Sequence, residues 1–341
     1  MHLKRELLTP QELISEYPMT EQGAAIKQAN DRAVRDALTG SSGKLLLVMG
    51  PCSADREDSV MEYMERLRPL QDEVSERIVI VPRIYTNKPR TTGDGYKGML
   101  HQPDPSSGPD LWEGLAASRK LHLRALLETG FSGADEMLYP ENLIFISDLL
   151  SYVTVGARSV ENQQHRLTAS GLDVPVGMKN PTGGDLAVMM NSIRAAQHPH
   201  SFIYRNWEVS TDGNPLAHAI LRGYVDSHGV SHPNYQFESL QRLHDLYRAA
   251  ECVNPAVVVD CNHANSGKRY DQQGRIARQM LGFMREGGDV GRLIRGLMIE
   301  SYLEDGCQAS GGREYGKSIT DPCLGWEKTR RLVLELAELV P

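Results

Sequence analysis

Short apolar runs alternate with longer amphipathic segments along the chain. Four runs stand out by their unbroken aliphatic character, at residues 45–49, 78–81, 257–259 and 297–299. Apolar runs of this length that end in polar residues are typical of parallel strands buried on both faces. Weaker segments at residues 134–138, 153–158, 175–179 and 217–222 bring the plausible strands to eight.

Between these runs, apolar residues recur with the spacing of a helix face. The recurrences are Val60, Met64 and Leu67, then Leu240, Leu243 and Tyr247, then Ile276, Met280 and Phe283. Such stripes are the core-facing side of amphipathic helices. Strands that alternate with helices predict a parallel sheet, and eight such units predict an α/β fold of the (β/α)8, or TIM, barrel type.

Two regions fall outside the repeat. Residues 1–43 are interpreted as an N-terminal extension, helical over residues 21–38 and ending at Gly40, and residues 44–341 as the barrel. Residues 201–215 contain Ile203, Tyr204 and Trp207 before the turn-forming sequence TDGN, which predicts a short inserted β-hairpin. Because a bare barrel of roughly 250 residues needs no extension, we expect this one to contact a neighbouring subunit in a homodimer or homotetramer.

Four potential metal ligands lie near strand ends or in the last loop. Cys52 occurs in GPCS, His263 in DCNHANSGK, Glu300 in GLMIES and Asp321 in GKSITDPC. The C-terminal ends of barrel strands converge on one mouth, so these side chains are expected to meet there. A thiolate, an imidazole and two carboxylates suit one divalent ion, with manganese, iron, cobalt and zinc all remaining candidates. Each residue alone has an ordinary interpretation, such as a buried cysteine or a helix-capping aspartate, so the prediction rests on their conjunction.

Basic residues also follow the apolar runs. They are Arg83, Lys88, Arg90, Lys97, Arg158, Lys179 and Arg222. Cations at strand ends would point into the same mouth, where arginine matches phosphate and carboxylate oxygens bidentately. The whole chain carries a net charge of −7, so this interpretation depends on local placement rather than on composition. The mouth is predicted to bind small, highly anionic substrates.

Composition excludes several other classes of protein. The five cysteines form no CxxC pair, which argues against a zinc ribbon or a disulfide framework and indicates a reducing compartment. The start of the chain has no apolar signal segment, and no stretch approaches the roughly 18 apolar residues of a membrane span. We therefore expect a cytoplasmic protein that binds no membrane. The absence of a basic run with interleaved aromatic residues argues against nucleic-acid binding.

A series of motifs gives the chain a specific resemblance. The motifs are GPCS, KPRTT followed by YKG, GARSVENQQHR, GMKNPTGG, ILRG, HANSGK, MIES and YGKSITDPCLGWE. In this order they resemble the type I 3-deoxy-D-arabino-heptulosonate 7-phosphate (DAHP) synthases, in the branch that carries an N-terminal extension. The resemblance implies a metal-dependent transferase that condenses phosphoenolpyruvate with erythrose 4-phosphate, the first step of the shikimate pathway towards aromatic amino acids.

The resemblance also implies roles for individual residues. Arg83, Lys88 and Lys179 would bind the phosphoenolpyruvate carboxylate. Its phosphate would be bound by Arg158, Arg222 and Lys97 together with the backbone N–H near Ala157. Arg90 and Thr91 would receive the erythrose phosphate. Glu136 would lie near the attacking water, and the catalytic set would be Lys88, Glu136, His263 and Asp321. Either Asp321 or a water at the metal would transfer the proton, and the sequence does not choose between them.

Several features depart from the family pattern. The segment from Lys88 to Lys97 is one residue longer than KPRTTVGWKG and has Tyr96 in place of tryptophan, and CSADR carries Asp55 where the family has a histidine. The hairpin is shorter than the pattern and contains the bulky Tyr204. In the family the hairpin and the extension build a feedback pocket for aromatic amino acids, so we expect weak or absent inhibition here.

Two alternative functions remain at this point. One is condensation of phosphoenolpyruvate with a different aldose phosphate, such as arabinose 5-phosphate. KPRTT argues against it, because those enzymes carry a KANRS-like segment there. The other is a non-catalytic regulator that binds phosphoenolpyruvate, which would have no need to keep four metal ligands.

Overall fold

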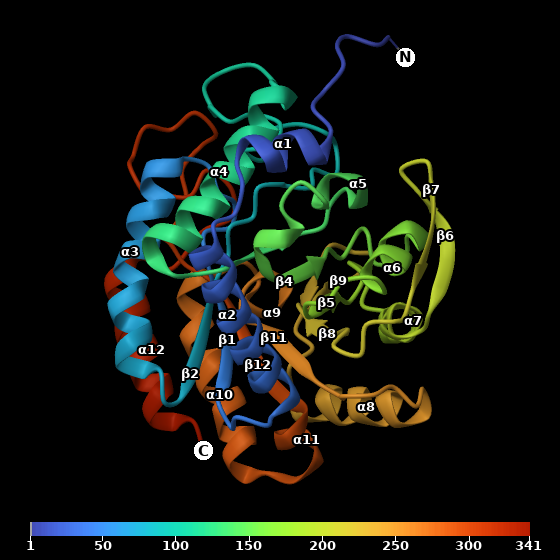
Figure 1. Ribbon diagram of the computed structural model, residues 1–341. Helices are drawn as coiled ribbons and strands as arrows, with labels where there is room; N and C mark the ends of the chain where they lie inside the picture. The colour runs from blue at the N-terminus through green and yellow to red at the C-terminus, as the bar shows by residue number, and fades with distance from the viewer. Residues whose placement is uncertain (1) are drawn as a thin grey trace.

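Eight parallel strands form a nearly closed barrel in the computed structural model, which describes residues 2–341 (Figure 1). The strands are β1 (Leu45–Gly50), β2 (Ile78–Pro82), β3 (Gly133–Glu136), β4 (Leu150–Val155), β5 (Val176–Lys179), β8 (His218–Leu221), β11 (Val257–Asp260) and β12 (Ile294–Glu300). Their order is β2-β1-β12-β11-β8-β5-β4-β3, and a parallel bridge between Arg83 and Ala134 joins the two edges. The predicted TIM barrel and its eight strands are confirmed.

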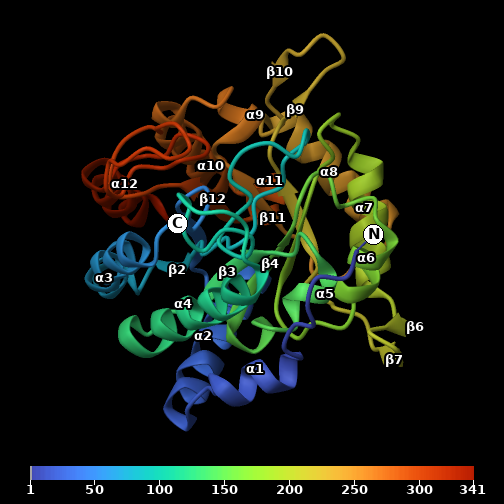
Figure 2. The same cartoon turned by 90° about the horizontal axis from the view of Figure 1, so that it is seen from above.

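Helices follow the strands, and most of them surround the barrel on the outside (Figure 2). They are α3 (Glu57–Val74), α4 (Leu111–Thr129), α5 (Pro140–Leu143), α6 (Gln163–Ala169), α7 (Leu186–Gln197), α8 (Phe237–Ala249), α9 (His263–Ser266), α10 (Gln273–Glu286), α11 (Gly288–Leu293) and α12 (Trp326–Leu339), with 3-10 turns at Ser147–Leu149 and Tyr270–Gln272. The predicted stripes are buried on α3, α8 and α10, with Phe283 only partly covered. Helical periodicity therefore located these core faces correctly.

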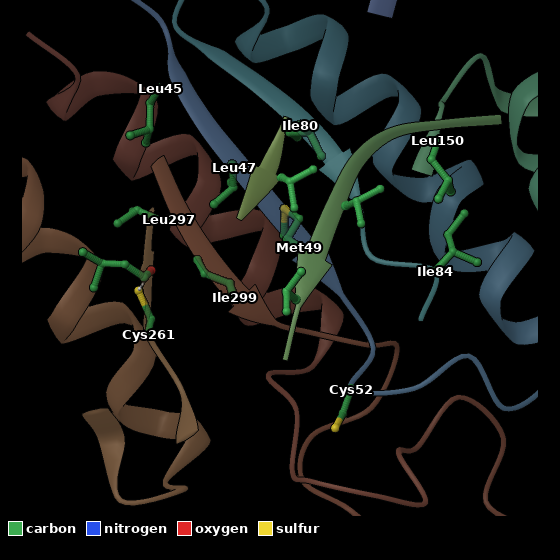
Figure 3. Close-up of a cluster of buried hydrophobic side chains, with 14 of the residues drawn as sticks. Leu45, Leu47, Met49, Cys52, Ile80, Ile84, Leu150, Cys261, Leu297 and Ile299 are labelled. Atoms are coloured by element: carbon green, nitrogen blue, oxygen red, sulfur yellow. Dashed lines mark hydrogen bonds between the residues drawn. The ribbon is translucent and has the colours of Figure 1, made fainter. Parts of the chain in front are cut away.

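Alternate residues of each strand enter two different cores. Leu45, Leu47 and Met49 of β1 point outwards into the cluster shared with the helices, which also contains Leu297 and Ile299 (Figure 3). Their neighbours Leu46 and Val48 belong instead to a second cluster inside the barrel. Because side chains alternate between the two faces of a strand, burial on both faces produces the unbroken apolar runs of the sequence.

Residues 2–43 hold two helices, α1 (Pro10–Glu16) and α2 (Glu21–Thr39). Helix α2 ends at Gly40, whose φ of 80° suits a glycine helix cap, so the predicted helix is correct to within one residue. Val34, Ala37 and Leu38 of α2 join the cluster inside the barrel, so this helix closes the end of the barrel opposite the mouth. The sequence patterns did not predict α1. The role of the extension in subunit contacts stays a prediction.

The predicted hairpin is present as the antiparallel pair β6 (His200–Tyr204) and β7 (Trp207–Thr211). Its turn consists of Arg205 and Asn206, both with positive φ, as a type I′ hairpin turn requires. A second small ribbon, β9 (Tyr224–Val225) with β10 (Ser231–His232), stands at the mouth and was not predicted (Figure 2). Within residues 2–341, no helix combines the length and the apolar character needed to cross a membrane.

The packing of α2 predicts a large loss of stability when its apolar face is trimmed. Leu38→Ala should lower the free energy of unfolding by roughly 2–5 kcal/mol, because the buried side chain leaves a cavity inside the barrel. Leu3→Ala is the matched control, since Leu3 is fully exposed, and should change stability by less than about 0.5 kcal/mol. Urea denaturation measures both. Equal stability of the two variants would contradict the role given to α2.

Candidate active site

A cavity of about 420 Å³ opens at the carboxyl ends of the barrel strands. Almost every site residue predicted from the sequence lines it: Cys52, Arg83, Lys88, Arg90, Thr91, Glu136, Ala157, Arg158, Lys179, Arg222, His263, Glu300 and Asp321. These residues come from segments far apart in the chain, and the parallel barrel brings them to one mouth. The cavity therefore combines potential metal ligands with a concentration of cations.

Three of the predicted metal ligands lie close together. One ligand atom each from Cys52, Glu300 and Asp321 fall within 4.8 Å of one another. The fourth, His263, points its Nε2 atom towards Glu300, 3.8 Å from Oε1. One sulfur, one nitrogen and two carboxylate oxygens therefore face a common volume, a donor set that first-row divalent metals accept.

Groups behind these side chains orient them as they would behind a metal centre. The second ring nitrogen of His263, Nδ1, lies 2.8 Å from Oδ2 of the buried Asp260. Asn262 donates a hydrogen bond to Oε2 of Glu300, which leaves Oε1 directed to the cavity. Metal-binding histidines characteristically use their second nitrogen in this way, because it fixes the ring and the tautomer. The residues present therefore fit a single divalent ion.

Two lysines neutralise the acidic groups of this cluster. Lys88 Nζ donates to Cys52 Sγ at 2.7 Å and to Asp321 Oδ2 at 3.0 Å, and Lys268 Nζ lies 3.0 Å from Asp321 Oδ1. Burial, reinforced by Glu300, raises the pKa of the Cys52 thiol to about 12. Burial acts in the same direction on Asp321, but Lys88, His263 and Lys268 outweigh it and hold the pKa of that carboxyl below its usual value.

Arg83 is the most deeply buried cation of the site, with 2% of its surface exposed. Its Nη2 atom lies 3.2 Å from Oε1 of Glu300, and its guanidinium carbon lies 4.0 Å from the centre of the Tyr85 ring. Burial opposes the charged form, but Tyr85 and Glu300 overcome it and raise the pKa of Arg83. The Nη1 atom has no partner among the described residues. An anionic ligand in the cavity can satisfy it.

Glu136 and Lys179 form a second buried pair across the mouth, with Oε2 and Nζ 3.9 Å apart. Burial lowers the pKa of Lys179, and Glu136 opposes that shift. Gly156 borders Glu136 so closely that a Cβ atom there would lie 2.4 Å from its Oε1. The GAR motif therefore keeps glycine where the carboxylate needs room.

Comparisons with known proteins agree with this site. Residues 17–334 match the model of the DAHP synthetase I family. The chain belongs to this family. It is 38% identical over 339 residues to the phospho-2-dehydro-3-deoxyheptonate aldolase, Tyr-sensitive, of Escherichia coli K12, covering 97% of this chain and 92% of that one. The Trp-sensitive protein of the same organism is 37% identical over 342 residues, covering 98% and 95%.

A solved structure extends the likeness to three dimensions. The phospho-2-dehydro-3-deoxyheptonate aldolase of Francisella tularensis SCHU S4 superimposes with a TM-score of 0.92 at 29% identity, covering 100% of this chain and 98% of that one.

A third relative by sequence is the Haemophilus influenzae protein of the same name. It is 36% identical over 344 residues, covering 98% of this chain and 92% of its own.

The positions of two lysines were not predicted correctly from the sequence. Lys97 is exposed and does not line the cavity, because the loop that carries it turns its neighbour Tyr96 inwards. The Tyr96 hydroxyl donates to the carbonyl of Ala54 at 3.0 Å, and its own carbonyl accepts from Arg90 Nε at 2.8 Å. Lys268, in contrast, lines the cavity and was not singled out, although it belongs to the HANSGK motif.

Asp55, the residue that departs from the family pattern, faces away from the cavity. Its carboxylate accepts a hydrogen bond from the Tyr302 hydroxyl at 2.9 Å, and burial raises the pKa of Asp55 to about 6. It is absent from the residues that line the cavity.

Proposed function

We propose that the chain condenses phosphoenolpyruvate with erythrose 4-phosphate and water, giving 3-deoxy-D-arabino-heptulosonate 7-phosphate and inorganic phosphate. Membership of the DAHP synthetase I family over residues 17–334 supports this activity. The observation that carries the proposal is the single cavity in which four metal-ligand side chains adjoin a set of converging cations. Substrates with two phosphates and a carboxylate need this concentration of fixed positive charge.

Phosphoenolpyruvate occupies the deep part of the cavity in this proposal. Arg83, Lys88 and Lys179 bind its carboxylate, and the first and last of these are almost fully buried. Its phosphate is bound by Arg158 and Arg222, with the backbone N–H near Ala157. Lys97 is exposed and does not line the cavity, so its assignment to this phosphate stays a prediction. Buried cations with unfilled hydrogen-bonding capacity strengthen the binding of anionic oxygens.

The reaction follows from this placement. The C3 carbon of phosphoenolpyruvate attacks the aldehyde carbon of the sugar, and water adds at C2. Phosphate then leaves by cleavage of the C2–O bond, as the C2 hydroxyl becomes the ketone carbonyl and its proton passes to the departing phosphate. Glu136, beside Lys179 at 3.9 Å, accepts the proton of the attacking water. The cationic Lys88 lies next to Cys52 and Asp321 and donates a proton to the former aldehyde oxygen, so the protons balance.

Cys52, His263, Glu300 and Asp321 would hold the divalent ion, with manganese, iron, cobalt and zinc compatible with this set. When bound, the ion supplies Lewis-acid polarisation of the aldehyde oxygen. With Cys52 and Asp321 engaged as ligands, the Lys88 ammonium that contacts both of them would be available to the substrate.

Arg90 and Thr91 would bind the phosphate of the aldose, since both line the open side of the cavity. The curated relatives given above are all named as heptonate aldolases, which favours erythrose 4-phosphate over another aldose phosphate. A regulator without catalytic activity would not need the complete ligand set.

Assembly as a homodimer or homotetramer remains part of the proposal. The hairpin supports it by exposing Ile203 and Trp207, with 77% and 74% of their surfaces accessible. Beneath the same hairpin lies a second cavity of about 380 Å³, lined by Phe202, Tyr204 and Val209 together with residues of α5 and α6. No described residue of the N-terminal extension lines it.

The ligand cluster predicts dependence on a metal. Removal of the ion with a chelator should abolish condensation, and Cys52→Ser and His263→Ala should each lose bound metal, because each removes one donor. Cys307→Ser is the matched control, since Cys307 is exposed and lies outside the cluster. Metal analysis and phosphate release measure both properties. Full turnover by a chelated, metal-free sample would exclude the proposed role of the ion.

The positions of the cations predict that different arginines bind the two substrates. Arg158→Ala or Arg222→Ala should raise KM for phosphoenolpyruvate roughly 10- to 150-fold, because each removes a charge-assisted contact of roughly 1.5–3 kcal/mol. Arg90→Ala should instead raise KM for the aldose. Arg292→Ala, which removes an exposed arginine paired with Asp289, should change neither value. Identical KM profiles for the three cavity variants would show that the roles are misassigned.

The hairpin cavity predicts weak or absent inhibition by aromatic amino acids. Its lining includes the bulky Tyr204, whose hydroxyl donates to the carbonyl of Pro140 at 2.7 Å, and none of residues 2–43 of the extension. Millimolar phenylalanine, tyrosine or tryptophan should change initial rates by less than about twofold, against the roughly 5- to 150-fold of typical allosteric coupling. Strong inhibition that disappears in Val209→Trp, which fills the cavity, would show a working effector site.

A further inference from the structure

Three buried asparagines connect the ends of β5, β8 and β11 at the mouth. Asn180 directly follows β5, Asn265 lies in α9 after β11, and Asn234 follows the β9–β10 ribbon that stands over the same side of the mouth (Figure 2). Their exposed fractions are 0%, 4% and 5%. They form a chain of hydrogen bonds: Asn234 Nδ2 donates to Asn180 Oδ1 at 3.1 Å, and Asn234 N donates to Asn265 Oδ1 at 2.9 Å.

This chain encloses the backbone of Arg222. The Arg222 N–H donates to Asn180 Oδ1 at 2.9 Å, and the Arg222 carbonyl accepts from the backbone N–H of Asn265 at 3.2 Å. The preceding carbonyl, of Leu221, accepts from Asn265 Nδ2 at 3.0 Å. Both hydrogen-bonding groups of the Arg222 backbone are therefore taken by asparagine residues.

The next residue, Gly223, is held in the same way. Its N–H donates to Asn234 Oδ1 at 2.7 Å, and its carbonyl accepts from Asn180 Nδ2 at 2.9 Å. Its φ is 72°, and a Cβ atom there would lie 2.6 Å from the backbone nitrogen of Asn265. Glycine is required at this point because the chain turns in the left-handed region directly against α9.

Only amide side chains can make these contacts. Asn180 uses both N–H groups as donors, to the carbonyls of Pro181 and Gly223, while its oxygen accepts from Arg222 and Asn234. A carboxylate has no N–H to donate and would face carbonyl oxygens. A serine is too short to reach both neighbours. The network therefore requires amide side chains, which donate and accept hydrogen bonds at once, and a polar side chain of another type cannot replace them.

The guanidinium of Arg222, in contrast, has no protein partner of its own. The Arg222 side chain lines the cavity, but it makes no hydrogen bond or ion pair with any residue in the range 2–341. The point from which the side chain extends into the cavity is set by its anchored backbone. Preorganised charges bind a ligand or transition state more strongly than charges that must first be oriented.

We infer that Asn180, Asn234 and Asn265 are positioning residues that anchor Arg222 and so set the affinity for the phosphate of phosphoenolpyruvate. The inference rests on the proposed function, in which Arg222 binds this phosphate. It deepens that proposal by naming residues that never touch the substrate. It also assigns a structural role to the β9–β10 ribbon, because the chain leaves the ribbon at the position of Asn234.

Asn234→Asp tests the inference with an almost isosteric change. The aspartate keeps an acceptor for the Gly223 N–H but places a carboxylate oxygen against Asn180 Oδ1 in place of the lost donor. The expected result is a rise of about tenfold in KM for phosphoenolpyruvate, with KM for the aldose unchanged, because a small displacement of Arg222 weakens phosphate binding. The defect should shrink as the pH falls, since a protonated aspartate donates again and restores the contact.

Asn214→Asp is the matched control. Asn214 is 1% exposed, and its Nδ2 donates to the carbonyls of Ala169 and Val174 away from the mouth. This variant should lose thermal stability and keep its KM for phosphoenolpyruvate. A double variant of Asn234→Asp with Arg222→Ala should bind phosphoenolpyruvate no worse than Arg222→Ala alone, because the anchored residue is gone.

Equal KM changes in the two aspartate variants, or a further loss in the double variant, would overturn the inference. If Asn234→Asp does not fold, Asn234→Ala enters the same cycle and removes the same donor. Calorimetric titration with inorganic phosphate gives a measurement that needs no turnover. Weaker phosphate binding in the Asn234 variant supports the anchoring role, and unchanged binding contradicts it. Failure of the wild type to release phosphate from phosphoenolpyruvate and aldose would instead reject the proposed function.

Discussion

Closure of eight parallel strands into one ring is the constraint on which this active site depends. The closing bridge joins Arg83, just after β2, to Ala134 of β3, and the Arg83 N–H also donates to the carbonyl of Met49 in β1. The most buried cation of the cavity therefore sits at the seam of the barrel. Its backbone is fixed by three strands, and its side chain reaches Glu300 at the end of β12. Because parallel strands all end on the same side, ligands and cations separated by hundreds of residues in the sequence meet at one mouth.

The charge balance of the mouth decides how tightly anions can be held. A net charge of −7 over the whole chain would repel phosphorylated substrates at long range, yet the cavity itself collects arginines and lysines. Buried cations are costly to desolvate unless carboxylates compensate them. Glu136 beside Lys179, Glu300 beside Arg83 and Asp321 beside Lys88 supply that compensation. Each carboxylate also has a role in the proposed reaction or in metal binding, so the groups that compensate the buried cations also serve the proposed function.

The sequence predicted the barrel and most of the cavity because both depend on local patterns. Apolar runs mark strands buried on two faces, and the residue after a run must lie at the mouth. The predictions that rested on loops succeeded less well. Lys97 was expected in the cavity, but the longer loop buries Tyr96 and turns Lys97 outwards. Helix α1, the β9–β10 ribbon and the asparagine network were not predicted, since short elements and amide contacts leave no periodic signal.

The two halves of the cavity differ in how their residues are supported. Arg83, Lys179 and Arg222, assigned to phosphoenolpyruvate, lie at or directly after the ends of strands, whereas Lys88 lies on the segment after β2. Arg222 is further anchored by three asparagines. Arg90 and Thr91, assigned to the aldose, lie on the long segment between β2 and α4, where Arg90 depends on one hydrogen bond to the backbone of its own loop. Strand-borne groups hold a fixed geometry, whereas loop-borne groups tolerate insertions. This segment is also one residue longer than the family pattern, so any change in aldose preference within the barrel would arise there, while the phosphoenolpyruvate half stays bound to the sheet.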